Sequence, residues 1–142
     1  MLSIQISDIK DFMSHLLSKD TFDHFYFIEA SIKMGVSYQI QGRINEGFYD
    51  TSVEQTLNRE FCYWKEIRHR IFDIIKGKRL PLSCKIVLGL SKQSISYLIA
   101  HNNSSFREED IEGIYINILY DPKNLLITTG ISYKNFSLDK SL

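Results

Sequence analysis

The chain has 142 residues, of which 44% are hydrophobic and 24% charged, and its formal net charge at pH 7 is zero. This composition predicts one soluble globular domain over residues 1–142. No stretch approaches the ~18 apolar residues of a membrane span, which argues against membrane contact. Charged residues stand where the apolar core of a secretory signal would lie, so we expect a cytoplasmic protein.

Residues 1–45 are predicted to form a strand, a helix and a β-hairpin. Apolar and polar residues alternate over 2–6, which predicts a strand with one buried face. Ser7 is the expected N-cap of the following helix, whose apolar residues recur at three- and four-residue steps. The first half therefore opens with a strand and an amphipathic helix.

The register of the hairpin that follows can be predicted from its side chains. A three-residue loop at 33–35 pairs Ile28 with Ile40, whereas a two-residue loop would pair Ile40 with Glu29. Because a one-residue slip turns every side chain to the other face of the sheet, the three-residue loop is favoured. Gly35 would then take the left-handed position that such loops use.

A helix over about 58–77 is predicted to connect the two halves. Asn58 is its expected N-cap, and Gly77 is its expected left-handed stop. Apolar residues recur between them with a helical period, and Trp64 and Ile71 belong to that stripe. We therefore expect this helix to pack its apolar stripe against the core.

Residues 82–136 repeat the order of strand, helix and hairpin. The alternation of the first strand returns, and Ser91 is the expected N-cap of the next helix. A type I turn at 121–124, with Asp first and Pro second, pairs Ile118 with Ile127. The predicted fold class is therefore α+β, with two strand–helix–β-hairpin halves joined by a central helix. The halves share little residue identity, so the internal repeat is one of element order only.

Several stretches resemble those of an uncharacterised bacterial family of small proteins, a domain of unknown function. They are Ile9-Lys10-Asp11-Phe12-Met13, Lys76-Gly77-Lys78-Arg79 with Pro81-Leu82-Ser83, Thr128-Thr129-Gly130, and Phe136-Ser137-Leu138-Asp139-Lys140. The resemblance runs along nearly all of the chain, but the family carries no assigned activity, so it implies no substrate, cofactor or site residue. Its members continue into a further helix, so a C-terminal helix is expected to be missing here.

The order of the elements is also similar to one domain of a sliding DNA clamp, in topology only. That resemblance implies helices whose basic faces meet the duplex and neutralise its phosphates. Here the first helix carries three acidic residues against two basic ones, namely Asp8, Asp11, Asp20, Lys10 and Lys19. The resemblance therefore leaves a clamp-like fold open and argues against a ring on DNA.

The sequence contains no set of residues arranged for catalysis or metal binding. No HxH, HExxH or CxxC spacing occurs, and neither does a glycine-rich phosphate loop or a GxSxG motif. We therefore expect no catalytic residue, no metal and no cofactor. The four histidines, which are His15, His24, His69 and His101, are therefore not expected to be metal ligands. Both cysteines, Cys62 and Cys84, are expected to be free thiols.

The chain departs from neutrality in one region. Residues 59–85 hold eight basic and three acidic residues, a local excess of five positive charges. Lys76, Lys78 and Arg79 form a candidate anion-binding site within it. The alternative is a solvated helix face with a basic last turn that complements the helix dipole.

Three classes of function follow from these observations. The first is a non-catalytic protein-interaction module that binds a protein partner or a second copy of itself. The second is a nucleic-acid-associated or anion-binding protein that uses the 76–79 connection, and the third is an enzyme of unrecognised type. Association with a second copy or with a protein partner is expected through an apolar patch near the C-terminus. Phe25 and Phe27 are expected to add uncovered area, because they lie on the other side of their strand from Ala30 and Ile32.

Overall fold

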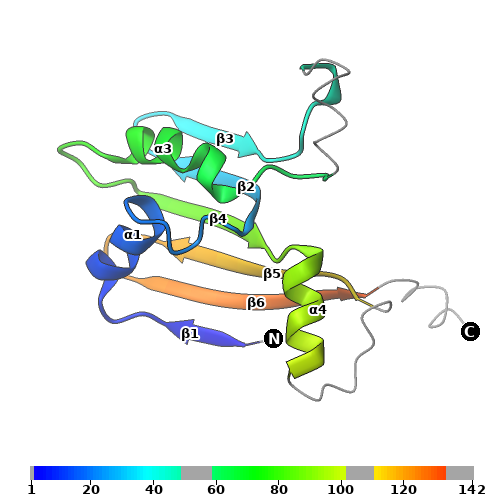
Figure 1. The fold of residues 1–142 in the computed structure, drawn as a ribbon. Coiled ribbons are helices and arrows are strands. Elements are labelled where there is room, and N and C mark those ends of the chain that lie inside the picture. Colours follow the sequence, from blue (N-terminus) through cyan, green and yellow to red (C-terminus); the bar gives the residue numbers. More distant parts are fainter. Residues whose placement is uncertain (1, 49–58, 102–110, 134–142) are drawn as a thin grey trace, which may run out of the picture.

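The computed structural model describes residues 2–48, 59–101 and 111–133. Its centre is a six-stranded antiparallel sheet with strand order β1-β6-β5-β4-β2-β3 (Figure 1). The strands are β1 (Ser3–Gln5), β2 (Tyr26–Lys33), β3 (Ser37–Gln41), β4 (Ser83–Gly89), β5 (Ile111–Tyr120) and β6 (Leu125–Tyr133). The helices are α1 (Ile9–Leu17), α3 (Trp64–Ile75) and α4 (Lys92–His101), with a 3-10 turn η1 (Glu46–Phe48).

The α+β class and the predicted order of elements are confirmed, but the two halves are not arranged alike in the sheet. In the second half β4 lies directly beside β5. In the first half β1 lies at the far edge of the sheet beside β6, while β2 pairs with β4. Both halves therefore contribute strands to one sheet, and the repeat is confined to the order along the chain.

The second hairpin has the predicted register, and the first does not. Ile118 pairs with Ile127 as expected. In the first hairpin Ile40 pairs with Ala30 instead of Ile28, because the loop occupies 34–36 instead of 33–35. The two registers differ by two residues and therefore place the same side chains on the same faces, so alternation alone does not distinguish them.

A β-bulge at Ile28 overturns the predicted facing of the aromatic residues in β2. The pairing of β2 with β4 shifts between Phe27 and Glu29, so Ile28 is an extra residue and the alternation reverses there. Phe27 consequently joins Ala30 in the core and is fully buried. Phe25 packs against the same core, so the uncovered aromatic surface expected from the sequence is absent at these two residues.

Three helix starts were predicted, and the structure confirms one of them. Ser91 caps α4, because its Oγ accepts a hydrogen bond from the Ser94 N–H at 3.2 Å. In α1 the cap is Asp8 instead of Ser7, and its Oδ1 accepts from the Asp11 N–H at 3.0 Å. Helix α3 begins only at Trp64, and Asn58 lies outside the described residues.

The late start of α3 has a structural cause in the residues before it. Phe61 forms an isolated β-bridge with Arg43, and Tyr63 forms one with Tyr26. These residues are therefore extended alongside the first hairpin and cannot belong to the helix. At the other end, α3 ends at Ile75 and Lys76 is already extended, so the helix stops just before Gly77. Gly77 has φ +152°, the one positive φ among the described glycines, and Gly35 does not take the left-handed conformation expected of it.

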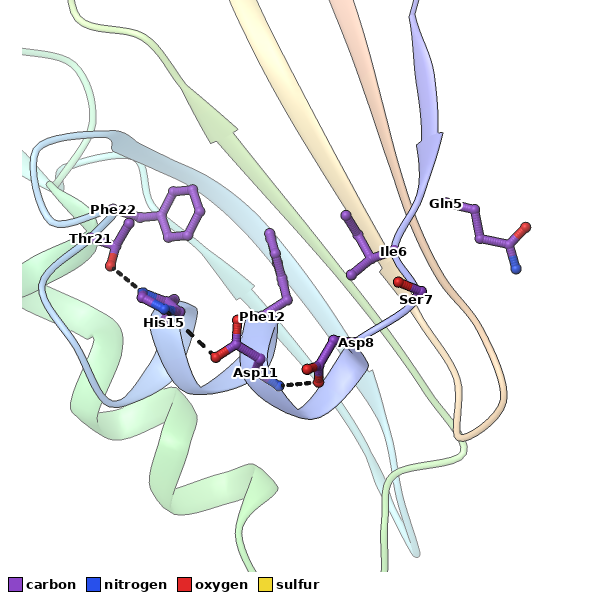
Figure 2. Close-up of a pocket in the computed structure, with 9 residues that line it drawn as sticks. All are labelled: Gln5, Ile6, Ser7, Asp8, Asp11, Phe12, His15, Thr21 and Phe22. Atoms are coloured by element: carbon purple, nitrogen blue, oxygen red, sulfur yellow. Dashed lines mark hydrogen bonds and ion pairs between the residues drawn. The ribbon is translucent and has the colours of Figure 1, made fainter.

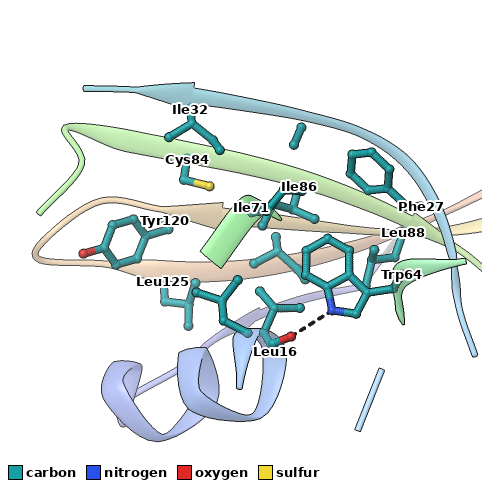
Figure 3. Packing of buried hydrophobic residues seen from close by; sticks show 13 residues of the cluster. Leu16, Phe27, Ile32, Trp64, Ile71, Cys84, Ile86, Leu88, Tyr120 and Leu125 are labelled. Atoms are coloured by element: carbon teal, nitrogen blue, oxygen red, sulfur yellow. Dashed lines mark hydrogen bonds between the residues drawn. The ribbon is translucent and has the colours of Figure 1, made fainter. Parts of the chain in front are cut away.

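Helices α1 and α3 pack on one face of the sheet and enclose the hydrophobic core (Figures 1 and 3). Trp64 and Ile71 of α3 are both fully buried, which confirms that this helix is central to the core. All three residues of β1, by contrast, are exposed; Ile4 is 47% exposed, and Leu2 just before the strand is 58% exposed. The predicted buried face of the first strand is therefore wrong for Leu2 and Ile4, whereas Ile6, just after β1, packs against the core.

Gly42 is expected to be irreplaceable because the chain passes too close to it for any side chain. A Cβ built at Gly42 would lie 1.9 Å from the Phe27 carbonyl oxygen. Gly42→Ala should therefore lower the free energy of unfolding by about 1–3 kcal/mol or more, measured by urea denaturation. Gly35→Ala, where a Cβ meets nothing within 4 Å, is the matched control and should stay within about 0.5 kcal/mol. Equal effects of the two substitutions would contradict the close approach.

Candidate functional site

The three predicted basic residues lie on one exposed connection between α3 and β4. Lys76, Lys78 and Arg79 are all exposed, while Pro81 is buried and fixes the connection to the domain. The Leu82 N–H donates a hydrogen bond to the Lys33 carbonyl at 2.8 Å, which ties the connection to the end of β2. The structure therefore brings the predicted site residues together on an anchored loop at one end of the sheet (Figure 1).

The three cations are not equally available to a ligand. Lys76 Nζ lies 3.2 Å from Asp73 Oδ1, so its charge is already partly compensated. Lys78 and Arg79 make no hydrogen bond or ion pair within the described residues. An incoming anion would therefore meet Lys78 and Arg79 first.

Two exposed leucines stand next to these cations, and sequence reasoning missed their significance. Leu80 and Leu82 are 66% and 70% exposed, on either side of the buried Pro81. Large apolar side chains that are this exposed and this close together commonly mark an interaction site. We call the surface of Lys76, Lys78, Arg79, Leu80 and Leu82 the basic tip.

A shallow depression of about 480 Å³ continues from the basic tip over the sheet. Ser83, which follows Leu82, lines it, and its walls include a row of residues paired across four neighbouring strands. By strand alternation the row lies on the face turned away from α1 and α3. The residues of the row are Ser31, Lys85, Leu119 and Leu126. Here too a cation stands beside two partly exposed leucines.

A second hollow, of about 460 Å³, lies beside α1 and contains a carboxylate, an imidazole and a hydroxyl in line (Figure 2). His15 Nδ1 is 2.9 Å from Thr21 Oγ1, and His15 Nε2 is 3.8 Å from Asp11 Oδ1. This order of groups is that of an activated hydroxyl nucleophile. The distance to the carboxylate is beyond hydrogen-bond reach, and the Asp11 and Thr21 side chains are exposed. The set therefore connects the last turn of α1 to the following loop.

A third hollow, of about 330 Å³, opens between α4, the ends of β4 and β5, and residues 59–61. Beside it Arg59 donates to both carboxylate oxygens of Glu66, at 2.6 and 3.1 Å, and lies 4.3 Å from the centre of the Tyr63 ring. The Arg59 hydrogen bond lowers the pKa of Glu66, against an opposing effect of burial. Because this charged pair is already satisfied internally, it fixes residues 59–66 in place instead of offering a free anion site.

Tyr115 and the two cysteines are poor reactive groups, because burial disfavours the deprotonated form of each. Burial, reinforced by the charge of Glu112, raises the pKa of Tyr115 in the third hollow. Burial raises the pKa of the Cys84 thiol to about 12 and also raises that of Cys62. Both cysteines are free. Within the described residues no group of three or more His, Cys, Asp or Glu side chains could hold a metal ion.

The fold and the site together define a small α+β domain with a single antiparallel sheet and a basic, apolar tip at one end. The chain belongs to DUF5721, a family of unknown function whose model matches residues 15–142. The expected membership of an uncharacterised family is thus confirmed. No curated protein and no solved structure shows significant similarity to the chain. None of the helices described is long and apolar enough to cross a membrane.

Proposed function

We propose that the chain is a non-catalytic protein-interaction module whose basic tip binds an acidic partner segment that also carries apolar side chains. The observation that carries this proposal is the exposure of Leu80 and Leu82 beside Lys78 and Arg79. A partner that covers leucines exposed to water on a fixed loop lowers the free energy of the complex, because apolar surface leaves the solvent. Cations without internal partners favour carboxylates over neutral or basic segments.

The neighbouring depression supports a partner that extends beyond the tip itself. Lys33 and Lys85 line it together with Leu119 and Leu126, against one acidic residue, Asp121. The combination of cations and leucines found at the tip is thus repeated along the adjoining face of the sheet. An extended acidic segment with leucine-like side chains would meet the same chemistry along its length.

The proposal can be tested with a fluorescein-labelled peptide of alternating glutamate and leucine, followed by fluorescence anisotropy. We expect micromolar binding that weakens as salt is added, because part of the attraction is between exposed charges. Leu80→Ser combined with Leu82→Ser should weaken binding at least about tenfold, through loss of apolar burial. Lys78→Glu combined with Arg79→Glu should weaken it as much and remove most of the salt dependence.

Matched controls lie elsewhere on the surface. Lys10→Glu with Lys92→Glu changes the net charge equally, at two exposed residues outside both the tip and the neighbouring depression, and should leave binding within about twofold. A peptide with lysine in place of glutamate should not bind. Equal loss in the control and tip variants, or equal binding of the lysine peptide, would refute the proposal.

The same assay addresses the anion-binding alternative, which Lys78 and Arg79 favour because neither forms an ion pair with the part of the chain that the structure describes. Here the probe is a short DNA duplex, whose phosphates need cations and make no use of leucines. Tighter binding to the duplex than to the acidic peptide, lost with the charge reversals but kept with the leucine substitutions, would establish that alternative.

A further inference from the structure

The outer edge of β3 lacks the features that normally keep a sheet edge from pairing. β3 is the last strand of the sheet (Figure 1). Within the described residues no backbone hydrogen bond reaches its outer side. Residues 36–41 read Val-Ser-Tyr-Gln-Ile-Gln, with no charge and no proline. Exposed edges are usually protected by lysines, prolines, bulges or very short strands. The opposite edge, β1, is only three residues long and so has such protection.

The hydrogen-bonding phase of β3 shows which of its backbone groups are available. Along an antiparallel ladder, residues alternate between pointing their N–H and C=O at the neighbouring strand and away from it. The Gly42 N–H donates to the Ile28 carbonyl at 2.8 Å, so residues in phase with Gly42 point toward β2. Ser37, Gln39 and Gln41 are out of phase with it and therefore present their backbone groups outward.

We infer that β3 pairs with β3 of a second copy of this chain, antiparallel and centred on Gln39. In this register Gln39 faces Gln39 of the second copy, and Ser37 faces Gln41, so the outward backbone groups meet in hydrogen-bonded pairs. Tyr38 then faces Ile40 of the second copy. Both of these side chains lie on the α1–α3 side of the sheet, since they pair with Ile32 and Ala30. The two six-stranded sheets become one continuous sheet.

A second copy suits this edge because the strand is complementary to itself. The register keeps apolar side chains opposite apolar ones and polar opposite polar, and no charged residue lies within the strand to oppose its copy. A central glutamine pair can also exchange side-chain amide hydrogen bonds. The contact is small compared with standard protein interfaces, so we expect dissociation in the micromolar range. This inference concerns a different surface and does not depend on the proposed function of the basic tip.

Charge variants at the centre of the pairing test the inference by sedimentation velocity over a range of protein concentrations. Gln39→Lys places like charges face to face and should weaken the dimer at least about tenfold. Gln39→Glu should do the same. An equimolar mixture of the two variants should restore a dimer, because opposite charges then meet. Gln41→Lys is the matched control, because the introduced lysine faces Ser37 of the second copy and should weaken the dimer far less.

Hydrogen exchange of the unsubstituted protein gives a readout that does not depend on any variant. The amide protons of Ser37, Gln39 and Gln41 should exchange more slowly as the protein concentration rises, whereas those of β1 should not change. A monomer at every concentration would overturn the inference. So would a dimer that survives both Gln39→Lys and Gln39→Glu, or a mixture of the two variants that stays monomeric.

Discussion

Replacing Trp64 with alanine should lower the free energy of unfolding by about 3–5 kcal/mol, the usual cost of removing a buried aromatic side chain. Trp64 is fully buried between α1, α3 and the sheet, and its ring centre lies 5.7 Å from that of Phe27. Its Nε1–H donates to the Leu16 carbonyl at 2.8 Å, which joins α1 to α3 (Figure 3). The substitution therefore leaves both a cavity and an unsatisfied buried acceptor.

Urea denaturation followed by far-ultraviolet circular dichroism is the suitable measurement, since Trp64 is the chain's one tryptophan and its fluorescence is lost with it. Ile71→Ala, at the next fully buried position of α3, should cost about 2–5 kcal/mol. Leu80→Ala on the exposed tip is the control and should change stability by less than about 0.5 kcal/mol. Losses below about 0.5 kcal/mol at both Trp64 and Ile71 would show that α3 is peripheral.

Replacing Arg68 with alanine should lower the free energy of unfolding by about 3–5 kcal/mol, because the substitution leaves a buried carboxylate without its partner. Asp23 is the one buried charged residue in the described chain. Arg68 Nε and Nη2 donate to its two oxygens at 2.9 and 3.2 Å, and the two side chains are only 11% and 13% exposed. The pair joins α3 to the turn that leads from α1 into β2.

Arg43→Ala is the control that shows the effect of burial, because it breaks an ion pair that is exposed to solvent. The side chains of Arg43 and its partner Glu60 are 62% and 57% exposed. An exposed pair of this kind contributes about 1 kcal/mol or less. The double variant Arg68→Met with Asp23→Leu should recover much of the loss, because it removes both charges together. A loss for Arg68→Ala no larger than that for Arg43→Ala would show that the Asp23 carboxylate is solvated.

The two proposed surfaces would act together in a geometrically defined way. In the β3 pairing, the Val36 end of one strand lies beside the Gly42 end of the other. The basic tip is tied to the Val36 end, through the hydrogen bond between Leu82 and Lys33. A dimer would thus carry its two tips toward opposite ends of the continuous sheet. A partner with two acidic segments could engage both tips only if its linker spans that separation, which sets a length requirement for bivalent binding.

The sequence was sufficient to predict those features that depend only on interactions between residues close together in the chain. The second hairpin has its predicted register because Asp121 Oδ1 accepts hydrogen bonds from the Lys123 and Asn124 N–H groups, which fixes the turn locally. Ser91 caps α4 for the same reason, since its acceptor lies three residues from the donor. The apolar stripe with Trp64 and Ile71 correctly predicted the buried face of α3. The basic residues of the tip were likewise evident from local charge.

The features that the sequence did not predict depend on contacts between segments that are distant along the chain. The reversal of facing at Ile28 depends on β4 and on Gly42, which packs against the Phe27 carbonyl, and no periodicity within β2 reports either. Helix α3 starts at Trp64 because Tyr63 pairs with Tyr26, a partner far along the chain. The exposure of the tip leucines and the free edge of β3 are also properties of the assembled sheet. Alternation and capping act over a few residues, whereas burial and strand order depend on which distant segments meet.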